Sequence, residues 1–396
     1  MISDKMKSMV ANSSVIRAMF EEGKKMAVQY GADHVFDFSL GNPNVPAPSC
    51  VKEAILDIIE HEDSLHVHGY MSNSGYEEVR QTLAEHLNTL YGKSYSAENF
   101  LMTVGAAGGL NVIFKALLNP GDEVITVSPY FVEYRSYAGN FGAALIESPT
   151  DPDTFYPDIE DLERRITERT KILILNSPNN PTGVVYPESV IRAIGEMLSK
   201  KEKEIGHPIF IVSDEPYREI AFDGIEVPWI PDFYRNTVVG SSYSKSLSLP
   251  GERIGYLVIP SEAEDFENLV AACNVANRIL GYVNAPSLMQ LVVARCADAK
   301  TDVEFYDRNR KLLYKSLKDF GYTFTKPDGA FYFWVKSPVE DEREFVEYLK
   351  NNEQILVVPG RSFGCAGWVR IAYCVSHETI QNSLPGFERT AQHYGL

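Results

Sequence analysis

The sequence predicts an α/β fold, with a mostly parallel β-sheet between layers of helices and a smaller α+β unit after it. Two observations lead to this prediction. Between about residues 99 and 245, short runs that are apolar on both faces alternate with stretches of helical periodicity, which is the pattern of a parallel sheet covered on both sides. Several of these runs end in polar clusters, and ligands bind to such sheets beyond the carboxyl ends of the strands.

The segments before this region predict an arm and two helices. Residues 1–34 indicate an amphipathic arm that contains a helix, and residues 37–48 a short strand that leads into a Pro-rich loop. A polar loop over residues 66–75 separates two stretches of helical periodicity. Their apolar residues are Val51, Ile55, Ile58 and Ile59 in the first stretch and Val79, Leu83, Leu87 and Leu90 in the second.

The alternating region supplies the predicted sheet. Strands are predicted over residues 100–104, 123–127, 171–175, 209–213 and 238–242. Polar segments that contain Gly105, Asn180, Asp214 and Lys245 each follow one of these strands. Because the carboxyl ends of parallel strands meet at one edge of a sheet, we expect these four residues to converge on a single active site.

The last quarter of the chain has a different pattern of predicted elements. After about residue 290, short strands at 330–335, 355–358 and 368–373 alternate with two helical stretches. We therefore expect three parts. They are an N-terminal arm that belongs partly to the small domain (residues 1–45), a large domain (46–285) and a C-terminal small domain (286–396).

Composition narrows the choice of partners and of compartment. The 396 residues include 54 acidic and 37 basic side chains, for a net charge of −17, which argues against nucleic acid or an anionic membrane as a partner. No apolar run approaches the ~18 residues of a membrane span. The five cysteines are widely spaced without a Cys-x-x-Cys pair, so we expect a reducing, cytoplasmic location and no metal site.

Lys245 is the candidate nucleophile. It lies in a run of small hydroxyl residues between two strand-like stretches. Burial there would lower its pKa from about 10.4, because desolvation disfavours the ammonium form. The neutral amine is the form that attacks a carbonyl to make a Schiff base. The alternative is an ordinary loop lysine.

The segment Gly105-Ala-Ala-Gly-Gly follows a strand and opens a helix. Small residues let backbone N–H groups approach an anion, and a helix N-terminus carries positive partial charge. Arg253 would add a full charge and Ser242 and Ser244 hydroxyl groups, as a phosphate requires. A turn that serves only close packing is the alternative.

Four further polar residues are candidates for the same site. Asp214 ends a buried strand, where a carboxylate is costly unless it meets a cation such as a protonated pyridine nitrogen; a structural aspartate is the alternative. Tyr217 could donate its hydroxyl to a phenolate oxygen, and Asn180 lies in a turn. Arg370 lies inside an apolar strand and needs a carboxylate, from the protein or from a substrate. This is the inventory for pyridoxal phosphate acting on an amino acid.

These residues belong to segments that resemble the class I/II aminotransferases, pyridoxal-phosphate enzymes of fold type I. The matching segments are Asn176–Gly183, Asp214–Tyr217, Ser242–Tyr256, Pro327–Tyr332 and Arg370–Ala372, in the family's order over nearly the whole chain. The resemblance implies a seven-stranded, mostly parallel sheet and a homodimer with shared active sites.

The resemblance also implies a role for each candidate residue. Lys245 would form the Schiff base and carry the proton, Asp214 would pair with the pyridine nitrogen, and Asn180 and Tyr217 would bind the ring oxygen. Gly105, Ala106, Ala107, Ser242, Ser244 and Arg253 would hold the phosphate, and Phe131 (or Tyr130) would stack on the ring. Arg370 would bind the substrate α-carboxylate beside Gly41, and Tyr70 would reach the phosphate of the neighbouring subunit.

The substrate stays open at this point. Arg278 could bind a distal carboxylate, and its alternative is a surface arginine at a helix end. We expect transfer of an amino group from an L-amino acid, with aspartate ranked before alanine and aromatic amino acids, to a 2-oxoacid such as 2-oxoglutarate. C–S lyases, decarboxylases and synthases with the same lysine are the alternatives. A non-catalytic cofactor-binding module is a further one, against which Lys245 and Asp214 argue.

Overall fold

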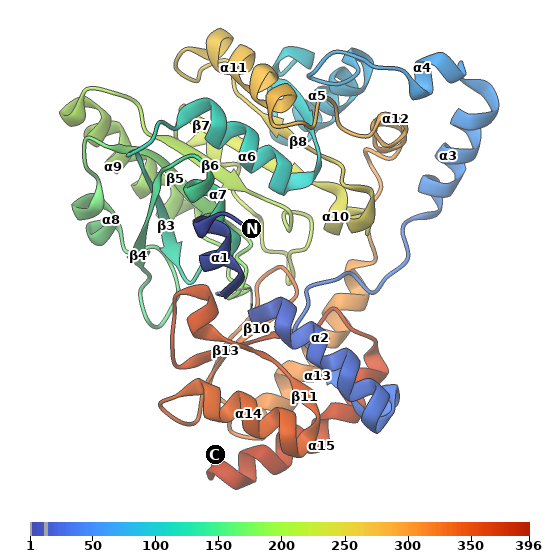
Figure 1. The fold of residues 1–396 in the computed structure, drawn as a ribbon, viewed down its shortest axis with the longest axis vertical. Helices are drawn as coiled ribbons and strands as arrows, with labels where there is room; N and C mark the ends of the chain where they lie inside the picture. Colours follow the sequence, from blue (N-terminus) through green and yellow to red (C-terminus); the bar gives the residue numbers. More distant parts are fainter. Residues whose placement is uncertain (1, 12–14) are drawn as a thin grey trace.

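The computed structural model describes residues 2–11 and 15–396, and Figure 1 labels its elements. The α-helices are α1 Asp4–Ala11, α2 Val15–Tyr30, α3 Ser49–His61, α4 Ser64–His68, α5 Glu77–Tyr91, α6 Gly105–Leu117, α7 Glu133–Asn140, α8 Ile159–Arg165, α9 Glu188–Ile205, α10 Tyr243–Ser246, α11 Phe266–Ile279, α12 Ser287–Arg295, α13 Val303–Asp319, α14 Glu342–Glu353 and α15 His377–Tyr394. No helix in the described residues is long and apolar enough to span a membrane.

A seven-stranded sheet forms the centre of the larger part of the molecule. Its strands are β2 Phe100–Thr103, β3 Glu123–Ser128, β4 Ala144–Pro149, β5 Thr170–Asn176, β6 Phe210–Asp214, β7 Thr237–Ser242 and β8 Gly255–Val258. Their order is β2-β8-β7-β6-β5-β3-β4. Only β8 runs antiparallel to its neighbours, β7 and β2. The predicted mostly parallel α/β sheet is confirmed.

Helices cover both faces of this sheet because its central strands are apolar on both sides. Along β5, Ile172 and Ile174 join the core on the side of α6 and α11. Leu173 and Leu175 join the core on the opposite side, with residues of α8 and α9. Alternate side chains of one strand therefore supply two cores, as the uniformly apolar strand sequence predicts.

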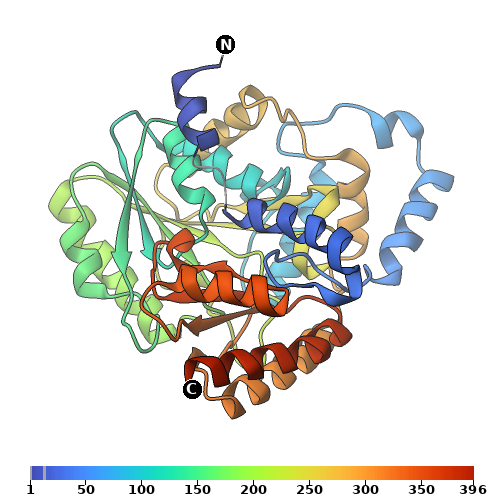
Figure 2. The ribbon, with the colours of Figure 1, turned by 60° about the horizontal axis from the view of Figure 1, so that its bottom comes forward.

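A smaller α+β unit lies below the large sheet in the view of Figure 1. Its antiparallel sheet has the order β12-β13-β10-β9, and β1 pairs with β11 in parallel. The bounds are β1 Phe36–Asp37, β9 Phe324–Thr325, β10 Tyr332–Lys336, β11 Ile355–Leu356, β12 Val358–Pro359 and β13 Trp368–Ala372. The N-terminal segment thus joins the C-terminal one, and α2 lies beside this unit in both views (Figure 1, Figure 2).

Some elements differ from the sequence prediction. The short helix α4 lies inside the predicted polar loop, capped by the Asp63 side chain, which accepts from the Leu65 N–H. Leu90 and Ile59 are exposed rather than part of the buried helix stripes. Helix α12 shares a core cluster with α3 and α5, through residues such as Met289 and Val292. The division at residues 285/286 stays a prediction.

Candidate active site

A cavity of about 260 Å³ lies at the carboxyl ends of β5, β6 and β7, between the two parts of the molecule. Of the predicted site residues, it brings together Gly41, Ala106, Ala107, Phe131, Asn180, Asp214, Tyr217, Ser242, Ser244, Lys245, Arg253 and Arg370. Gly105 lies at its edge, where an added Cβ would come within 2.8 Å of Arg253 Nη2. Residues far apart in the sequence therefore meet where the strand ends predict.

Lys245 lies in α10, the short turn of helix directly after β7. Its Nζ donates a hydrogen bond to the Gly41 carbonyl at 2.6 Å and lies 5.3 Å from the centre of the Phe331 ring. Burial lowers the pKa of Lys245 to about 8, and the nearby Arg370 and Arg253 charges lower it as well. The lowered pKa thus increases the fraction of the neutral, nucleophilic amine near neutral pH.

Asp214 is the last residue of β6. Its Oδ2 accepts a hydrogen bond from the Tyr134 hydroxyl at 2.5 Å. Its Oδ1 is buried and has no partner in the described chain. Burial raises the pKa of Asp214 to about 6. The carboxylate is therefore ionised at neutral pH, with one oxygen free for an N–H donor.

Arg370 on β13 is almost fully buried. Its Nη1 donates to Asn180 Oδ1 at 3.0 Å and its Nη2 to the Ser39 carbonyl at 2.5 Å, while its Nε has no partner in the described chain. The Tyr332 and Phe363 rings lie 4.6 and 4.8 Å from the guanidinium carbon. The described residues hold this cation with neutral groups alone, which leaves it free to bind a carboxylate.

Two close approaches shape the cavity wall. A Cβ at Gly41 would lie 2.1 Å from the Tyr332 hydroxyl oxygen, so only glycine fits there. The Tyr332 hydroxyl is in turn hydrogen-bonded to the Tyr217 hydroxyl at 2.7 Å. The two units of the molecule are thus in direct contact beside Arg370.

Helix α6 points its N-terminus at the cavity. Its first residue, Gly105, has φ of +68°, a conformation that favours glycine. Ala106 and Ala107, the next two residues of α6, line the cavity together with Arg253 and Ser242. Arg253 Nη1 donates to the Pro250 carbonyl at 2.8 Å, which fixes the guanidinium near the helix end. Helix N–H groups, a guanidinium and hydroxyls form an anion site suited to phosphate.

These observations fit a pyridoxal phosphate molecule. The unpartnered Asp214 Oδ1 can accept from a protonated pyridine nitrogen. The α6 N-terminus and Arg253 can hold the phosphate, and Phe131 in the cavity wall offers a ring face. Lys245 Nζ can reach a carbonyl carbon in the same cavity. In the described residues, no group of His, Cys, Asp and Glu is placed to hold a metal ion.

Sequence reasoning missed three tyrosines of the site. Tyr332 and Tyr137 line the cavity, and Tyr134 donates to Asp214. Tyr332 lies in the segment Pro327–Tyr332 that carries the family resemblance, which was a signal for it. Nothing in the sequence marks the other two, because the contact of Tyr134 joins residues 80 positions apart.

Two predicted site residues lie outside the cavity of their own chain. Tyr70 is 94% exposed, and Arg278 is exposed near the end of α11. Tyr70 is predicted to reach the phosphate of the neighbouring subunit, and Arg278 to bind a distal carboxylate of the substrate. Their roles stay predictions.

Comparisons with known proteins agree with this geometry. A family model described as aminotransferase class I and II matches residues 33–385. The aspartate/prephenate aminotransferase of Thermus thermophilus is 33% identical over 354 residues, which cover 88% of this chain and 89% of that protein. The aromatic-amino-acid aminotransferase 2 of Thermococcus litoralis is 28% identical over 402 residues, 98% of this chain and 97% of that protein. An aminotransferase structure from Eubacterium rectale superposes with a TM-score of 0.97 at 47% identity, over 100% of both chains.

Proposed function

The chain belongs to the class I and II aminotransferases and is a pyridoxal-phosphate-dependent transaminase, and we propose that aspartate is its preferred amino donor and that a 2-oxoacid such as 2-oxoglutarate is its acceptor. One observation carries the assignment of a substrate site. Arg370 is a buried cation without an acidic partner in the described chain, in the same cavity as Lys245 and Asp214. A substrate α-carboxylate would satisfy it with two parallel hydrogen bonds.

The side chains divide the chemistry between them. When bound, the cofactor supplies the carbonyl carbon that receives the amino group and a ring that withdraws electrons from the substrate Cα–H bond. Lys245 Nζ takes the proton from Cα and returns a proton to the oxoacid carbon in the reverse half-reaction. Asp214 holds positive charge on the ring nitrogen, and Tyr217 and Asn180 donate to the ring oxygen.

Which amino acid the cavity accepts depends on the cations that are available to bind the amino acid's side chain. Lys245, Arg253 and Arg370 are the cationic side chains that line the cavity in the described chain, and each already has a role. A distal carboxylate such as that of aspartate would need a further cation, for which Arg278 of a second copy is our candidate.

An aromatic donor is the second candidate. Tyr137, Phe131 and Leu40 give part of the cavity wall an apolar surface, on which an aromatic side chain could pack without a fourth cation. The name of the relative from Thermococcus litoralis, an aromatic-amino-acid aminotransferase, agrees with this option.

We also propose that the enzyme is a cytoplasmic homodimer. Tyr70 is 94% exposed on the isolated chain, as a residue that completes the neighbouring phosphate site would be. The five cysteines are free thiols in the structure, which suits a reducing compartment.

A panel assay tests the reaction and the donor together. The pure holoenzyme is incubated with single amino acids and 2-oxoglutarate, and glutamate, pyruvate and sulfide are measured. Glutamate formed fastest from aspartate supports the proposal, and glutamate formed fastest from phenylalanine or tyrosine supports the second candidate. Pyruvate or sulfide released without an added oxoacid would instead indicate a lyase.

The Arg278→Ala variant tests the origin of specificity. If Arg278 binds the distal carboxylate, the KM for aspartate rises about 10-fold or more while the KM for phenylalanine stays the same. An unchanged KM for aspartate would contradict the role of Arg278 and leave the transaminase assignment intact.

A further inference from the structure

Glu342, the first residue of α14, is fully buried although it is charged. Both of its carboxylate oxygens accept hydrogen bonds from one neighbouring segment, residues 360–367. Oε1 accepts from the Arg361 backbone N–H at 3.2 Å and from Arg361 Nε at 2.7 Å. Oε2 accepts from Arg361 Nη2 and from the Gly367 backbone N–H, both at 3.0 Å. One carboxylate therefore fixes both ends of the segment.

The ionised form of Glu342 is the one that makes these four contacts. Burial alone would raise the pKa of Glu342, but the hydrogen bonds from Arg361 and Gly367 outweigh it and hold the pKa below its usual value. A buried carboxylate with all its lone pairs used is costly to assemble and rigid once formed. Such a carboxylate can hold residues 360–367 in one fixed conformation.

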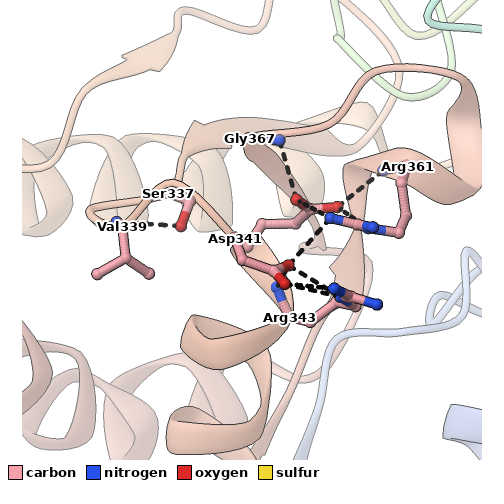
Figure 3. Close-up of polar contacts among 7 residues, drawn as sticks. Ser337, Val339, Asp341, Arg343, Arg361 and Gly367 are labelled. Atoms are coloured by element: carbon pink, nitrogen blue, oxygen red, sulfur yellow. Dashed lines mark hydrogen bonds and ion pairs between the residues drawn. The ribbon is translucent and has the colours of Figure 1, made fainter.

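The neighbouring charges differ from Glu342 in position and in contacts. Asp341 and Arg343 pair with each other at the start of α14, close to solvent. Asp341 also accepts from Arg361 Nη2 at 2.9 Å (Figure 3), whereas the Arg343 side chain donates hydrogen bonds to Asp341 and none to the described residues 360–367. Arg343 is thus a matched control within the same cluster.

The segment 360–367 packs against Arg370, one of the residues that line the cavity. Phe363, in its middle, is fully buried, and its ring lies 4.8 Å from the guanidinium carbon of Arg370. The same segment also contacts the large part of the molecule. The Phe363 carbonyl accepts from the Tyr130 N–H at 3.0 Å, and the Gly364 carbonyl accepts from Ser128 Oγ at 2.7 Å. The segment therefore bridges the two units directly beside Arg370.

We propose that Glu342 is a positioning residue for the substrate: by fixing residues 360–367 it holds Phe363 against Arg370, and so keeps the guanidinium aligned for the α-carboxylate. The inference rests on the proposed role of Arg370. Glu342 itself touches neither the cavity nor the reacting atoms.

The test is a kinetic comparison of Glu342→Ala with Arg343→Ala in the holoenzyme. Loss of alignment at Arg370 removes binding that substrate and transition state share, so the KM for the amino donor rises about 10-fold while kcat changes less than about 3-fold. Arg343→Ala leaves both constants as in the wild type. A general loss of folded enzyme would instead lower kcat per chain and leave KM unchanged.

A double-mutant cycle with Arg370→Ala shows whether Glu342 acts through Arg370. In the Arg370→Ala background, Glu342→Ala should change kcat/KM by less than about 2-fold, because the group it positions is already absent. The inference is overturned if Glu342→Ala leaves KM unchanged in the wild-type background. It is equally overturned if the change in kcat/KM is the same in both backgrounds.

A milder variant covers the case in which Glu342→Ala does not fold. Arg361→Lys keeps the charge but cannot make the same forked contacts, so a KM increase of about 3-fold is expected, and an unchanged KM overturns the inference. The proposed function fails separately. If Arg370→Ala alone leaves the KM for the donor unchanged, Arg370 does not bind the α-carboxylate, whatever Glu342 does.

Discussion

At the scale of single residues, burial sets the chemistry of Lys245. Its amine is enclosed among Gly41, Phe331 and the walls of the cavity. Desolvation lowers the pKa of Lys245 to about 8; the Cys374 thiol opposes this effect, and Arg370 and Arg253 add to it. At pH 7 about a tenth of the molecules therefore carry Lys245 as the neutral, nucleophilic amine, a far larger fraction than for an exposed lysine.

The first prediction concerns the pH dependence of cofactor capture by the apo-protein. Because the neutral amine reacts, the rate of covalent capture should rise with pH, reach half its maximum near the pKa of about 8 and then level off. Stopped-flow absorbance between pH 6.5 and 10 measures it. A rate that still climbs steeply at pH 10 would contradict the lowered pKa. Lys245→Ala should abolish the visible absorbance of the Schiff base between the lysine and the cofactor, and it should lower turnover by ~10³-fold or more.

The second prediction concerns Asp214, whose pKa burial raises to about 6. The folded apo-protein binds this proton more tightly than the unfolded chain does, so its stability falls as the pH rises from about 4 to 6. Asp214→Asn removes the buried charge. At pH 7 the apo-variant should be more stable than the wild type by up to about 3 kcal/mol, although transamination is lost. Urea unfolding measures the difference, and a less stable variant would refute the account.

At the scale of elements, the apolar pattern was enough to find the central strands. The predicted strands at 123–127 and 171–175 agree with β3 and β5 to within one or two residues. Strand β4 was not predicted, because it lies at the edge of the sheet and most of its side chains are partly exposed. The helix α4 was missed because its signal is one capping side chain, Asp63.

The candidate site divides in the same way. The convergence of Asp214 and Lys245 followed from strand polarity, which local sequence reveals. Tyr332 reaches the cavity through β10, whose pairing with β13 places it beside Tyr217. The contact between Tyr217 and Tyr332 joins residues 115 positions apart and leaves no local pattern. Apart from the family resemblance of the segment Pro327–Tyr332, this part of the site therefore needed the structure.

The third prediction concerns the α6 N-terminus. At Gly105, an alanine would meet φ of +68° and place its Cβ 2.8 Å from Arg253 Nη2. Gly105→Ala should cost about 1–2 kcal/mol of stability and, by displacing Arg253, weaken cofactor binding about 10-fold. Gly92→Ala is the control, since Gly92 has φ of +63° with no atom within 4 Å of an added Cβ. It should lose similar stability but keep the cofactor affinity, which equilibrium dialysis measures.

At the scale of the whole molecule, the active site is assembled between the two units. Gly41, Tyr332 and Arg370 come from the terminal segments, whereas Asp214 and Lys245 come from the large sheet. The residues that we propose for substrate binding and for the chemical step thus lie in separate parts of the chain. If Tyr70 acts as we propose, a second chain contributes as well.

The fourth prediction tests that shared site by mixing two chains that are each defective at a different residue of the site. Tyr70→Ala should lower the cofactor affinity about 10-fold or more, and Lys245→Ala should be inactive. After subunit exchange, a hybrid dimer holds one site with Lys245 from one chain and Tyr70 from the other. Half of the dimers are hybrids with one intact site each, so about a quarter of the wild-type activity should return at limiting cofactor. No recovery in a confirmed hybrid would mean that Tyr70 serves no partner site.

The antiparallel direction of β8 limits where the chain can accept an insertion. Because β8 runs antiparallel to β7, the chain returns at the same edge without a crossover helix, and Lys245 and Arg253 both lie on that short return. Parallel strands are joined by long excursions that can absorb an insertion far from the edge. The return from β7 to β8 has no such excursion, so one residue added between Lys245 and Arg253 would change the distance between the lysine and the guanidinium that we propose to bind the phosphate.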